Sequence, residues 1–492
     1  MTVRPHREPT AQLDLIDGVW CRPTESPTAT LDDPNTGEFR AAQTATAPEE
    51  VERALHAASS LHARGTWAWT PAEQRIELLS MIADGLDRRV AELGFEDAMA
   101  TGNPLRVATQ MASYLGPRVR SAVTQVREIG ESTSLPAAGR AVRLLRRPLG
   151  PAAVIAPWNA PTFVAVAKVA SALAAGCPVL LKPSEWAPAG CQLVAEVIKD
   201  AVAHLGLPPA VFQLVHGAAA VGGQLAADPR IRAISFTGGG AGGRAVAAAA
   251  APHFTALQLE LGGHNPVIIR PDADLAAAAA TLAEGMTKLN GQWCEAPGKI
   301  LIPGQMHDEF VASLLDELAT LRMGHCLDEA TDLGPLSHGS HRAHLQQRVD
   351  ALVARGGKAL TASPLPDLGG WFFAPTVVVG LRAGDSIHEL FGPAVSVHVV
   401  GSVAEALEAA DGPETGLAGF VFGGDLEAAL DTAARIPAGE IRVNGTKLAD
   451  LADGSEQTFW NSSGIGGHGP TDMVRFFQGR RVIGVDDPGL PV

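Results

Sequence analysis

Short apolar runs alternate with longer Ala-rich stretches between about residue 150 and residue 263. Apolar runs of roughly four to eight residues bounded by Gly or Pro are typical of buried strands, whereas longer stretches with apolar side chains three and four positions apart predict helices. This pattern predicts strands at 152–157, 178–183, 211–217, 232–238 and 256–263 and helices at 163–176, 190–206 and 243–251. Strands that alternate with helices of this length indicate βαβ units around a buried parallel sheet.

A second series of the same kind follows. It predicts helices at 274–291 and 307–321 and strands at 299–304, 396–401, 419–424 and 440–445. Residues 48–112 favour helices, with Thr70 as a cap before Pro71, and a polar turn at 33–38 starts a hairpin. The run 480–485 predicts a late strand at an edge used in assembly. We therefore expect an α/β fold with two Rossmann-like domains and a small assembly element.

Composition and charge exclude several classes of partner. The chain has 492 residues, 46% of them hydrophobic and 18% charged, and a net charge of −15. This acidic balance argues against nucleic acid or an anionic membrane as a partner. The five cysteines lack CxxC spacing, which indicates reduced thiols and predicts no metal site. Residues 1–15 lack the apolar core of a signal peptide, and no apolar run is long enough to span a membrane, so a cytoplasmic enzyme is expected.

Two residues suit covalent catalysis. Cys294 follows a long predicted helix in a Gly-flanked loop, where backbone amides or a nearby cation can lower the pKa of its thiol. A buried, inert cysteine is the alternative interpretation. Glu260 ends an apolar strand before Gly262 and Gly263, and a desolvated carboxylate has a raised pKa that suits a general base. A salt-bridged strand end explains Glu260 equally well.

Three further segments lie at predicted strand ends, where α/β folds build their sites. Asn159 can donate its side-chain amide to a developing oxyanion, or cap the next helix, or do both. Lys182 and Glu185 suit ribose and phosphate groups, although a surface ion pair explains them as well. The glycine-rich turn at 238–243 can present helix N-terminal amides to a pyrophosphate, but it does not match GxGxxG.

Taken together and in this order, these segments resemble the aldehyde dehydrogenase superfamily. The likeness extends from about residue 15 to about residue 485, and the interval between Glu260 and Cys294 resembles that of the family. The matching motifs are Pro-Trp-Asn at 157–159, Lys-Pro-Ser-Glu at 182–185, Phe-Thr-Gly at 236–238, Glu-Leu-Gly-Gly at 260–263, Gly-Gln-x-Cys at 291–294, Glu-Leu-Phe-Gly-Pro at 389–393, Val-Asn-Gly at 443–445 and Ser-Gly-Ile-Gly at 463–466.

The resemblance implies a role for each catalytic residue. Cys294 would attack the aldehyde to form a thiohemiacetal, and Asn159 and the Cys294 backbone amide would hold the oxyanion. Hydride would then pass to the nicotinamide and leave a thioester. Glu260 would activate the water that hydrolyses this thioester. Lys168 matches a lysine that supports proton traffic in the site.

The resemblance also implies a cofactor site. Lys182 and Glu185 would hold the adenosine ribose, Glu389 the nicotinamide ribose, and Phe391 would pack near the nicotinamide. NAD is favoured because Glu185 would repel a 2′-phosphate, although NADP stays possible. Gly239 stands where a serine often meets the pyrophosphate, so looser phosphate binding is expected. Further cofactor contacts are implied for Pro157, Trp158, Ser184, Gly217, Phe236, Thr237, Gly238, Gly239, Gly243 and Leu261.

Small side chains in the substrate tunnel set the expected substrate. Ala160, Val164 and Ala167 stand where the family usually has bulky residues in the substrate tunnel, which predicts a wider tunnel entrance. A bulky or aromatic aldehyde is therefore expected as substrate rather than acetaldehyde. Trp293 and Glu295 flank the nucleophile and are expected to touch the substrate, although loop packing is an equal interpretation for Trp293.

His468 marks a departure from the family pattern. Gly467 and His468 stand where Arg-Glu is common, which places an imidazole near the water path. A role of His468 in proton transfer is one hypothesis, and a surface histidine is the alternative.

The resemblance also implies how the chain is divided and assembled. An NAD(P)-binding domain would comprise 1–127 and 149–261, a catalytic domain 262–460, and an oligomerisation arm and tail 128–148 and 461–492. The arm would pair with the tail and support a homodimer or a homotetramer, between which the sequence does not choose.

Two other functions stay open at this point. One is a CoA-acylating dehydrogenase, in which a thiol rather than water takes the acyl group, and the presence of Glu260 argues against it. The other is a catalytically silent protein of the same fold, and the presence of Cys294, Glu260 and Asn159 together argues against that.

Overall fold

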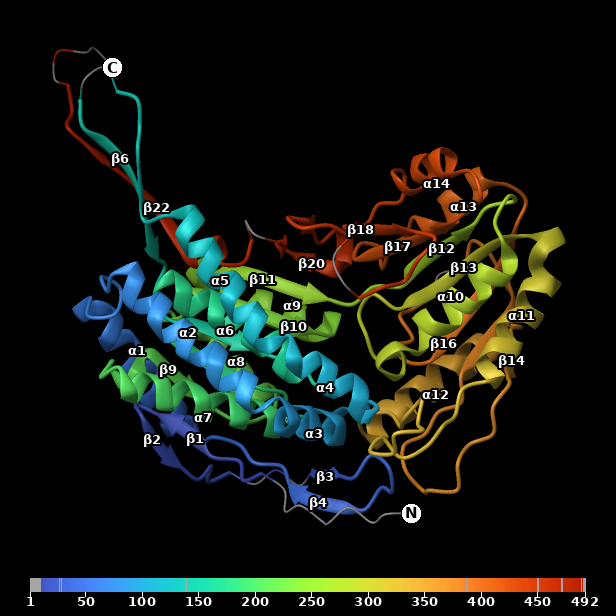
Figure 1. The fold of residues 1–492 in the computed structure, drawn as a ribbon, viewed down its shortest axis with the longest axis horizontal. Coiled ribbons are helices and arrows are strands. Elements are labelled where there is room, and N and C mark those ends of the chain that lie inside the picture. Colours follow the sequence, from blue (N-terminus) through green and yellow to red (C-terminus); the bar gives the residue numbers. More distant parts are fainter. Residues whose placement is uncertain are drawn as a thin grey trace.

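The computed structural model (Figure 1) describes residues 10–25, 27, 29–137, 140–385, 387–448, 451–469, 472–487 and 489. The expected absence of a signal peptide falls mainly on residues 1–9, which lie outside this range, as do the outermost ends of the ranges 1–127 and 461–492. Among the described helices, none combines the length and the apolar character that crossing a membrane requires.

The first of two large sheets has eight strands in the order β2-β1-β9-β8-β7-β10-β11-β20. Its central strands run parallel, as the alternation of strands and helices predicts. They are β7 (Ala152–Ile155), β8 (Val179–Lys182), β9 (Phe212–Leu214), β10 (Ala233–Gly238) and β11 (Ala256–Leu261). Antiparallel strands extend both edges: β1 (Asp14–Ile16) with β2 (Val19–Cys21) at one, and β20 (Gly464–Ile465) at the other.

Helices cover both faces of this sheet because alternate strand residues point to opposite sides. Ala152 and Val154 pack into one core and Ala153 and Ile155 into the other. The first core includes α2 (Ala72–Arg88), α3 (Val90–Thr101), α5 (Leu115–Ile129), α6 (Pro161–Ala175) and α7 (Ala189–His204). The second includes α1 (Pro48–Arg64), α8 (Ala219–Ala227) and α9 (Gly240–Ala250).

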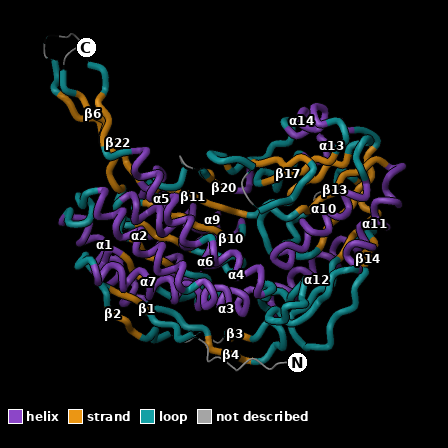
Figure 2. The backbone as a smooth tube through the Cα atoms, in the orientation of Figure 1, coloured by secondary structure: helices purple, strands orange, loops and turns teal. Residues whose placement is uncertain are grey.

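The second sheet has seven strands in the order β14-β15-β16-β13-β12-β17-β18 and lies beside the first (Figure 2). Its strands are β12 (Asn265–Ile269), β13 (Pro297–Pro303), β14 (Lys358–Thr361), β15 (Thr376–Arg382), β16 (Ala394–Val400), β17 (Ala418–Phe422) and β18 (Glu440–Val443). One face packs on α10 (Leu275–Thr287) and α11 (His307–Ala319), and the other on α13 (Val403–Ala410) and α14 (Leu426–Ala433). Another helix, α12 (Gly339–Ala354), packs against β15 and begins near the boundary with the first sheet.

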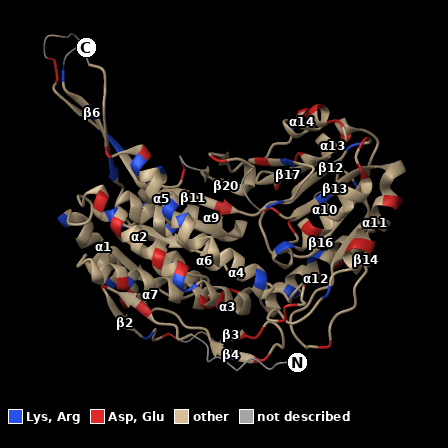
Figure 3. Cartoon of the chain, viewed as in Figure 1, with Lys and Arg blue, Asp and Glu red and all other residues tan. Residues whose placement is uncertain are grey.

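A small antiparallel sheet forms an arm that projects from the body (Figure 1). It consists of β5 (Ser132–Ser134), β6 (Val142–Pro148) and β22 (Gln478–Gly484), and the pairing of β6 with β22 confirms the predicted contact between arm and tail. Shorter elements are β3 (Thr30–Asp32), β4 (Phe39–Ala42), α4 (Leu105–Ser113), β19 (Gln457–Thr458) and β21 (Gly467–His468). Acidic and basic residues are interspersed along the outer helices of the body (Figure 3).

Each predicted strand and helix is present, but two details of the prediction are wrong. Thr70 does not cap the second helix: Pro71 occupies the N-cap position, and the Thr70 hydroxyl donates to the Thr66 carbonyl instead. The helix predicted over 274–291 ends at Thr287, because the chain turns into left-handed backbone just beyond it. The hairpin around 33–38 is confirmed by the pairing of β3 with β4.

Candidate active site

A cavity of about 1610 Å³ lies between the two large sheets, and residues of both line it. Lys182, Gly238 and Leu261, the last residues of β8, β10 and β11, reach it, so the cavity lies at the carboxyl ends of the parallel strands. All of the predicted site residues line this cavity except Gly217 and Gly243.

The two exceptions support the wall of the cavity from behind. Gly217 has a φ of 136° in the turn before α8, which a residue with a side chain rarely adopts. Gly243 lies against Leu261, where a Cβ atom would come within 2.5 Å of the Leu261 Cδ2 atom. Both glycines therefore have packing contacts in this structure, and their predicted contact with a cofactor stays a prediction.

The loop that carries Cys294 is held by side-chain amides. Asn265 donates from Nδ2 to the carbonyl oxygens of Cys294 and Ala296, both at 2.8 Å. Gln292 donates from Nε2 to the Thr101 carbonyl at 2.9 Å. Gly291, with a φ of 75°, lies so close to Gly392 that a Cβ atom would come within 2.1 Å of its carbonyl carbon. The nucleophile loop is thus fixed against both halves of the molecule.

The environment of Cys294 favours the neutral thiol. Burial raises the pKa of the Cys294 thiol well above its ordinary value, and the negative charges of Glu295, Glu260 and Glu389 raise it further. The sequence-based expectation of a lowered pKa is wrong here, because the thiol is buried and because Glu260 and Glu389, from distant parts of the chain, converge with the adjacent Glu295 on one cavity. Attack on a substrate therefore requires that the thiol lose its proton during the reaction.

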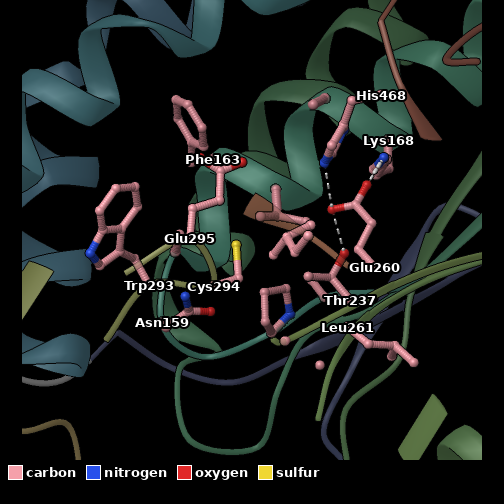
Figure 4. Close-up of a pocket in the computed structure, with 18 of the residues that line it drawn as sticks. Asn159, Phe163, Lys168, Thr237, Glu260, Leu261, Trp293, Cys294, Glu295 and His468 are labelled. Atoms are coloured by element: carbon pink, nitrogen blue, oxygen red, sulfur yellow. Dashed lines mark hydrogen bonds and ion pairs between the residues drawn. The ribbon is translucent and has the colours of Figure 1, made fainter. Parts of the chain in front are cut away.

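Glu260 lies at the centre of a cluster of polar contacts (Figure 4). Lys168 Nζ contacts its Oε1 atom, Thr237 donates from Oγ1 to Oε2 at 3.1 Å, and His468 Nε2 lies 3.4 Å from Oε2. Burial alone would raise the pKa of Glu260, but the charges of His468 and Lys168 and the hydrogen bonds outweigh it and lower the pKa. The predicted upward shift is wrong, and Glu260 is an ionised carboxylate over the neutral range.

Asn159 points at the nucleophile loop and not at the helix that follows it. Ala160 occupies the N-cap position of α6, and no side chain caps this helix. Asn159 donates from Nδ2 to the Gln292 carbonyl at 2.9 Å, so its amide lies beside Cys294 in Figure 4. The oxyanion interpretation is compatible with this placement, whereas the capping interpretation is not.

The opposite part of the cavity has groups that suit a dinucleotide. Lys182 Nζ lies 3.4 Å from Glu185 Oε2, and burial lowers the pKa of Lys182. Gly239 is the N-cap of α9, and no side chain caps that helix, so its first-turn amides face the cavity without a side-chain acceptor. A ribose-binding pair beside a helix N-terminus fits an adenosine ribose and a diphosphate.

Glu389 and two aromatic rings complete this part. A Cβ atom at Gly262 would lie 2.2 Å from Glu389 Oε2, so the carboxylate rests directly on a glycine. Burial raises the pKa of Glu389 to about 7, although Arg348 and an amide hydrogen bond from Gly263 oppose this shift. The Phe391 ring lies 5.4 Å from that of Trp158, edge to face. These groups fit the second ribose and the nicotinamide.

The substrate part of the cavity is shaped by one face of α6. Ala160, Val164 and Ala167 line it, as predicted, but Phe163 lies on the same face and adds a large ring. The Arg118 guanidinium lies over this ring, 3.6 Å from its centroid. The sequence offered no signal for either residue, because neither belongs to a motif and their contact joins α5 to α6.

The side chains of the two residues that flank Cys294 are each held by a partner. Trp293 is only 3% exposed and donates from Nε1 to the Gly285 carbonyl at 3.0 Å, which agrees with the loop-packing interpretation. Glu295 pairs with the buried Arg442, whose Nη1 atom lies 3.0 Å from Glu295 Oε2. Other lining residues that the sequence did not predict include Gln110, Met111, Tyr114, His341, His344 and Arg348.

The fold and this cavity place the protein among the α/β oxidoreductases that bind a dinucleotide at the carboxyl ends of parallel strands. The family model described as "Aldehyde dehydrogenase family" matches residues 20–483, and the chain belongs to this family. The predicted family membership and α/β fold class are therefore confirmed, and with them the expectation of an NAD(P)-dependent enzyme class.

Known relatives agree with this assignment over nearly the whole chain. Geranial dehydrogenase from Castellaniella defragrans is 31% identical over 441 residues, which cover 88% of this chain and 90% of the relative. A crystal structure of an aldehyde dehydrogenase from Pseudomonas syringae with NAD+ and octanal is 31% identical, with a TM-score of 0.89 and coverage of 97% and 98%. Betaine aldehyde dehydrogenase from Staphylococcus aureus with NAD+ is 27% identical, with a TM-score of 0.90 and coverage of 98% and 96%.

Proposed function

We propose that this protein oxidises an aldehyde to its carboxylic acid with NAD, through a covalent intermediate on Cys294 that Glu260-activated water hydrolyses. One observation supports this most: Cys294, Asn159 and Glu260 come from three segments and line a single cavity. The same cavity is lined by the groups described above that suit the riboses and the diphosphate of a dinucleotide. Membership of the aldehyde dehydrogenase family and the NAD+ in the related structures support the choice of cofactor.

In the first half-reaction Cys294 attacks the aldehyde carbon. The thiol releases its proton to solvent in the cavity, the sulfur bonds to the aldehyde carbon, and the Asn159 amide and the Cys294 backbone amide receive the negative oxygen of the thiohemiacetal. The same carbon then gives up a hydride, and the carbonyl forms again as a thioester. Each such donor is typically worth about 3 kcal/mol in the barrier. Bound NAD supplies the hydride acceptor and a positively charged ring, which opposes the carboxylates that raise the pKa of Cys294.

In the second half-reaction the thioester is hydrolysed. The ionised Glu260 takes a proton from water while the water oxygen attacks the thioester carbon and the carbon–sulfur bond breaks. Lys168 Nζ holds the carboxylate and also donates to Gln258 Oε1 at 3.1 Å, so it orients Glu260. A cation in this place also stabilises the negative charge that Glu260 carries between turnovers.

NAD is proposed over NADP because Glu185 would face the ribose 2′ position. The Glu185 carboxylate lies beside Lys182 at the edge of the adenosine part of the cavity. A 2′-phosphate there would meet a like charge, which costs binding energy. Lys182 offsets part of this repulsion, so NADP is expected to bind more weakly and not to be rejected.

The substrate is proposed to be a bulky or aromatic aldehyde. Ala160, Val164 and Ala167 leave room along α6, and Phe163 with the Arg118 guanidinium over it gives the cavity a rigid aromatic wall. Two relatives point the same way, since one is named for geranial and another holds octanal in its crystal structure.

An NADH-appearance assay with a panel of aldehydes tests this function. We expect kcat/KM for benzaldehyde and octanal to exceed that for acetaldehyde by about 10-fold or more, because a wide apolar cavity gains little from a two-carbon substrate. Narrowing the cavity with Ala167→Phe is expected to reverse the order of octanal and acetaldehyde. An equal or higher value for acetaldehyde with the unchanged protein would contradict the proposed substrate class.

The same assay separates the remaining alternatives. NADH formation without CoA, and no faster with it, is expected for hydrolysis by water. Strict dependence on CoA would indicate the acylating reaction, and no NADH with any aldehyde would indicate a silent protein of this fold.

We further propose the division of the chain that the family likeness implies. Residues 1–127 and 149–261 form the NAD-binding domain, 262–460 the catalytic domain, and 128–148 with 461–492 the arm and tail. The two large sheets support this division, with one addition: β20, from the tail, pairs with β11 in the first sheet.

The arm is proposed to join copies of the chain into a homodimer or a homotetramer. In its sheet β22 is an edge strand, and its Val482 is 63% exposed. Val482→Pro would remove an amide of β22 that faces away from β6, and we expect it to lower the molar mass measured by light scattering to that of a smaller assembly. Val399→Asp, on the exposed face of β16, is the control and should leave the mass unchanged. An unchanged mass for Val482→Pro would count against the arm as the interface.

A further inference from the structure

The C-terminal segment brings a histidine onto the catalytic carboxylate. In β20, Gly464 pairs with Glu260 of β11, so the tail runs directly along the strand that carries this residue. The chain then turns into β21, where His468 pairs with Gln457 of β19. Two short strand pairings thus fix the backbone of His468 beside Glu260, more than 200 residues away in the sequence.

The imidazole of His468 connects the buried carboxylate to the open side of the cavity. Its Nε2 atom lies 3.4 Å from Glu260 Oε2, and its side chain is 39% exposed whereas that of Glu260 is 9% exposed (Figure 4). The Phe459 ring meets the imidazole edge to face, with centroids 5.0 Å apart, and so fixes its orientation. Among the described residues, charged groups near this point include Lys168 from α6, Glu456 and Asp472.

Among the described groups that contact the Glu260 carboxylate, His468 alone has a lone pair that accepts a proton near neutral pH. Lys168 contacts it through an ammonium group, which donates and cannot accept, and the Thr237 hydroxyl also acts as a donor. A free imidazole has a pKa of about 6.5. When His468 is neutral, Lys168 and the Thr237 hydroxyl still lower the pKa of Glu260 and favour its ionised form, so a protonated Glu260 can donate to the imidazole that contacts it.

We propose that His468 is the second proton acceptor of the hydrolytic step, a role that rests on the proposed function. Water loses a proton to Glu260 as its oxygen bonds to the thioester carbon, and the carbon–sulfur bond then breaks to release the acid and the Cys294 sulfur. Glu260 passes the proton from Oε2 to Nε2 of neutral His468, and the exposed imidazole releases it to solvent. Glu260 is thereby an ionised base again for the next turnover.

The lifetime of the thioester on Cys294 tests this role directly. The protein is mixed rapidly with NAD and benzaldehyde, quenched with acid at intervals, and the acylated fraction is measured by intact-protein mass spectrometry. In the unchanged protein we expect the decay rate to rise between about pH 6 and pH 8, because a neutral imidazole accepts a proton and an imidazolium does not. In His468→Gln we expect acylation at the normal rate, decay slowed by about 10-fold at pH 8, and no rise over this range.

Two further variants separate proton transfer from a structural role. His468→Glu restores a proton acceptor, and we expect faster decay than in His468→Gln with the pH rise moved to lower pH. His204→Gln, at the end of α7 and outside the cavity, is the matched control and should match the unchanged protein.

Several results would overturn the inference. Decay in His468→Gln at the rate and with the pH dependence of the unchanged protein would do so, and so would slower decay that keeps the same rise with pH. These outcomes leave the proposed function intact. An unchanged protein that oxidises no aldehyde or forms no thioester on Cys294 would instead overturn the proposed function, and this inference with it.

Discussion

Cys294→Ser is expected to lower kcat/KM for the best aldehyde by about 10⁴-fold or more, the largest effect of any substitution considered. A serine hydroxyl is a far weaker nucleophile than a thiolate, and the burial and the negative charges that raise the pKa of Cys294 would also oppose ionisation of the serine. A steady-state NADH assay measures the loss, with an acid quench to show that no acyl group remains on the protein.

The accompanying control is cofactor binding. Asn265 and Gln292 hold the loop through backbone carbonyls, which the serine variant keeps, so its affinity for NAD should stay within about twofold of the original. A variant that binds NAD normally yet retains substantial turnover would refute covalent catalysis by Cys294. A variant that also loses NAD binding would show that the substitution disturbs the loop, and Cys294→Ala then provides the comparison.

Glu260→Gln is expected to produce the second largest effect, a decrease of about 10² to 10⁴-fold in steady-state kcat. The expected signature is a burst of NADH close to one equivalent per site, followed by slow turnover, because hydride transfer precedes the step that needs Glu260. Stopped-flow absorbance measures both phases. If Glu260→Gln loses the NADH burst as well as steady-state turnover, this result would contradict a role of Glu260 that is confined to hydrolysis.

The lowered pKa of Glu260 also fixes the direction of its pH dependence. Its carboxylate stays ionised until the pH falls below the ordinary glutamate value of about 4.3, so protonation of Glu260 does not limit hydrolysis near neutrality. The stability that the charged Glu260 gains from its neighbours is present above that value and is lost as the pH falls through the lowered pKa. Glu260→Gln removes this contribution and leaves Lys168 beside an uncharged amide, so a lower Tm is expected near pH 7.

Much of the fold and site follows from local sequence features. The strands from 152 to 263 are recognisable because each is a short apolar run between helices, and their carboxyl ends carry Asn159, Lys182 and Glu260. Parallel strands bring such ends to one edge, so a site could be placed there before any coordinates were known. Gly291 and Cys294 were recognisable through a contiguous motif.

What the sequence did not reveal depends on contacts between distant segments. The pKa directions of Cys294 and Glu260 depend on Lys168, Glu389 and His468, whose proximity no local pattern encodes. The stack of Arg118 on Phe163 joins two helices, the first of which lies beyond the helices predicted over 48–112. The predicted helix cap at Thr70 is also wrong, because its hydroxyl donates instead to the Thr66 carbonyl in the preceding turn.

The left-handed turn before the nucleophile loop has a mechanical consequence. Leu289, Asn290 and Gly291 all have positive φ, and Asn290 donates from Nδ2 to the carbonyls of both Gly102 and Pro335. Gly102 follows α3 in the half of the molecule built on the first sheet, whereas Pro335 precedes α12 in the other half. The Asn290 side-chain amide therefore connects the boundary between the two halves to the left-handed segment that precedes Cys294. If the halves moved apart at this boundary, the segment would lose these hydrogen bonds, so the position of the Cys294 sulfur is coupled to how closely the two halves approach each other.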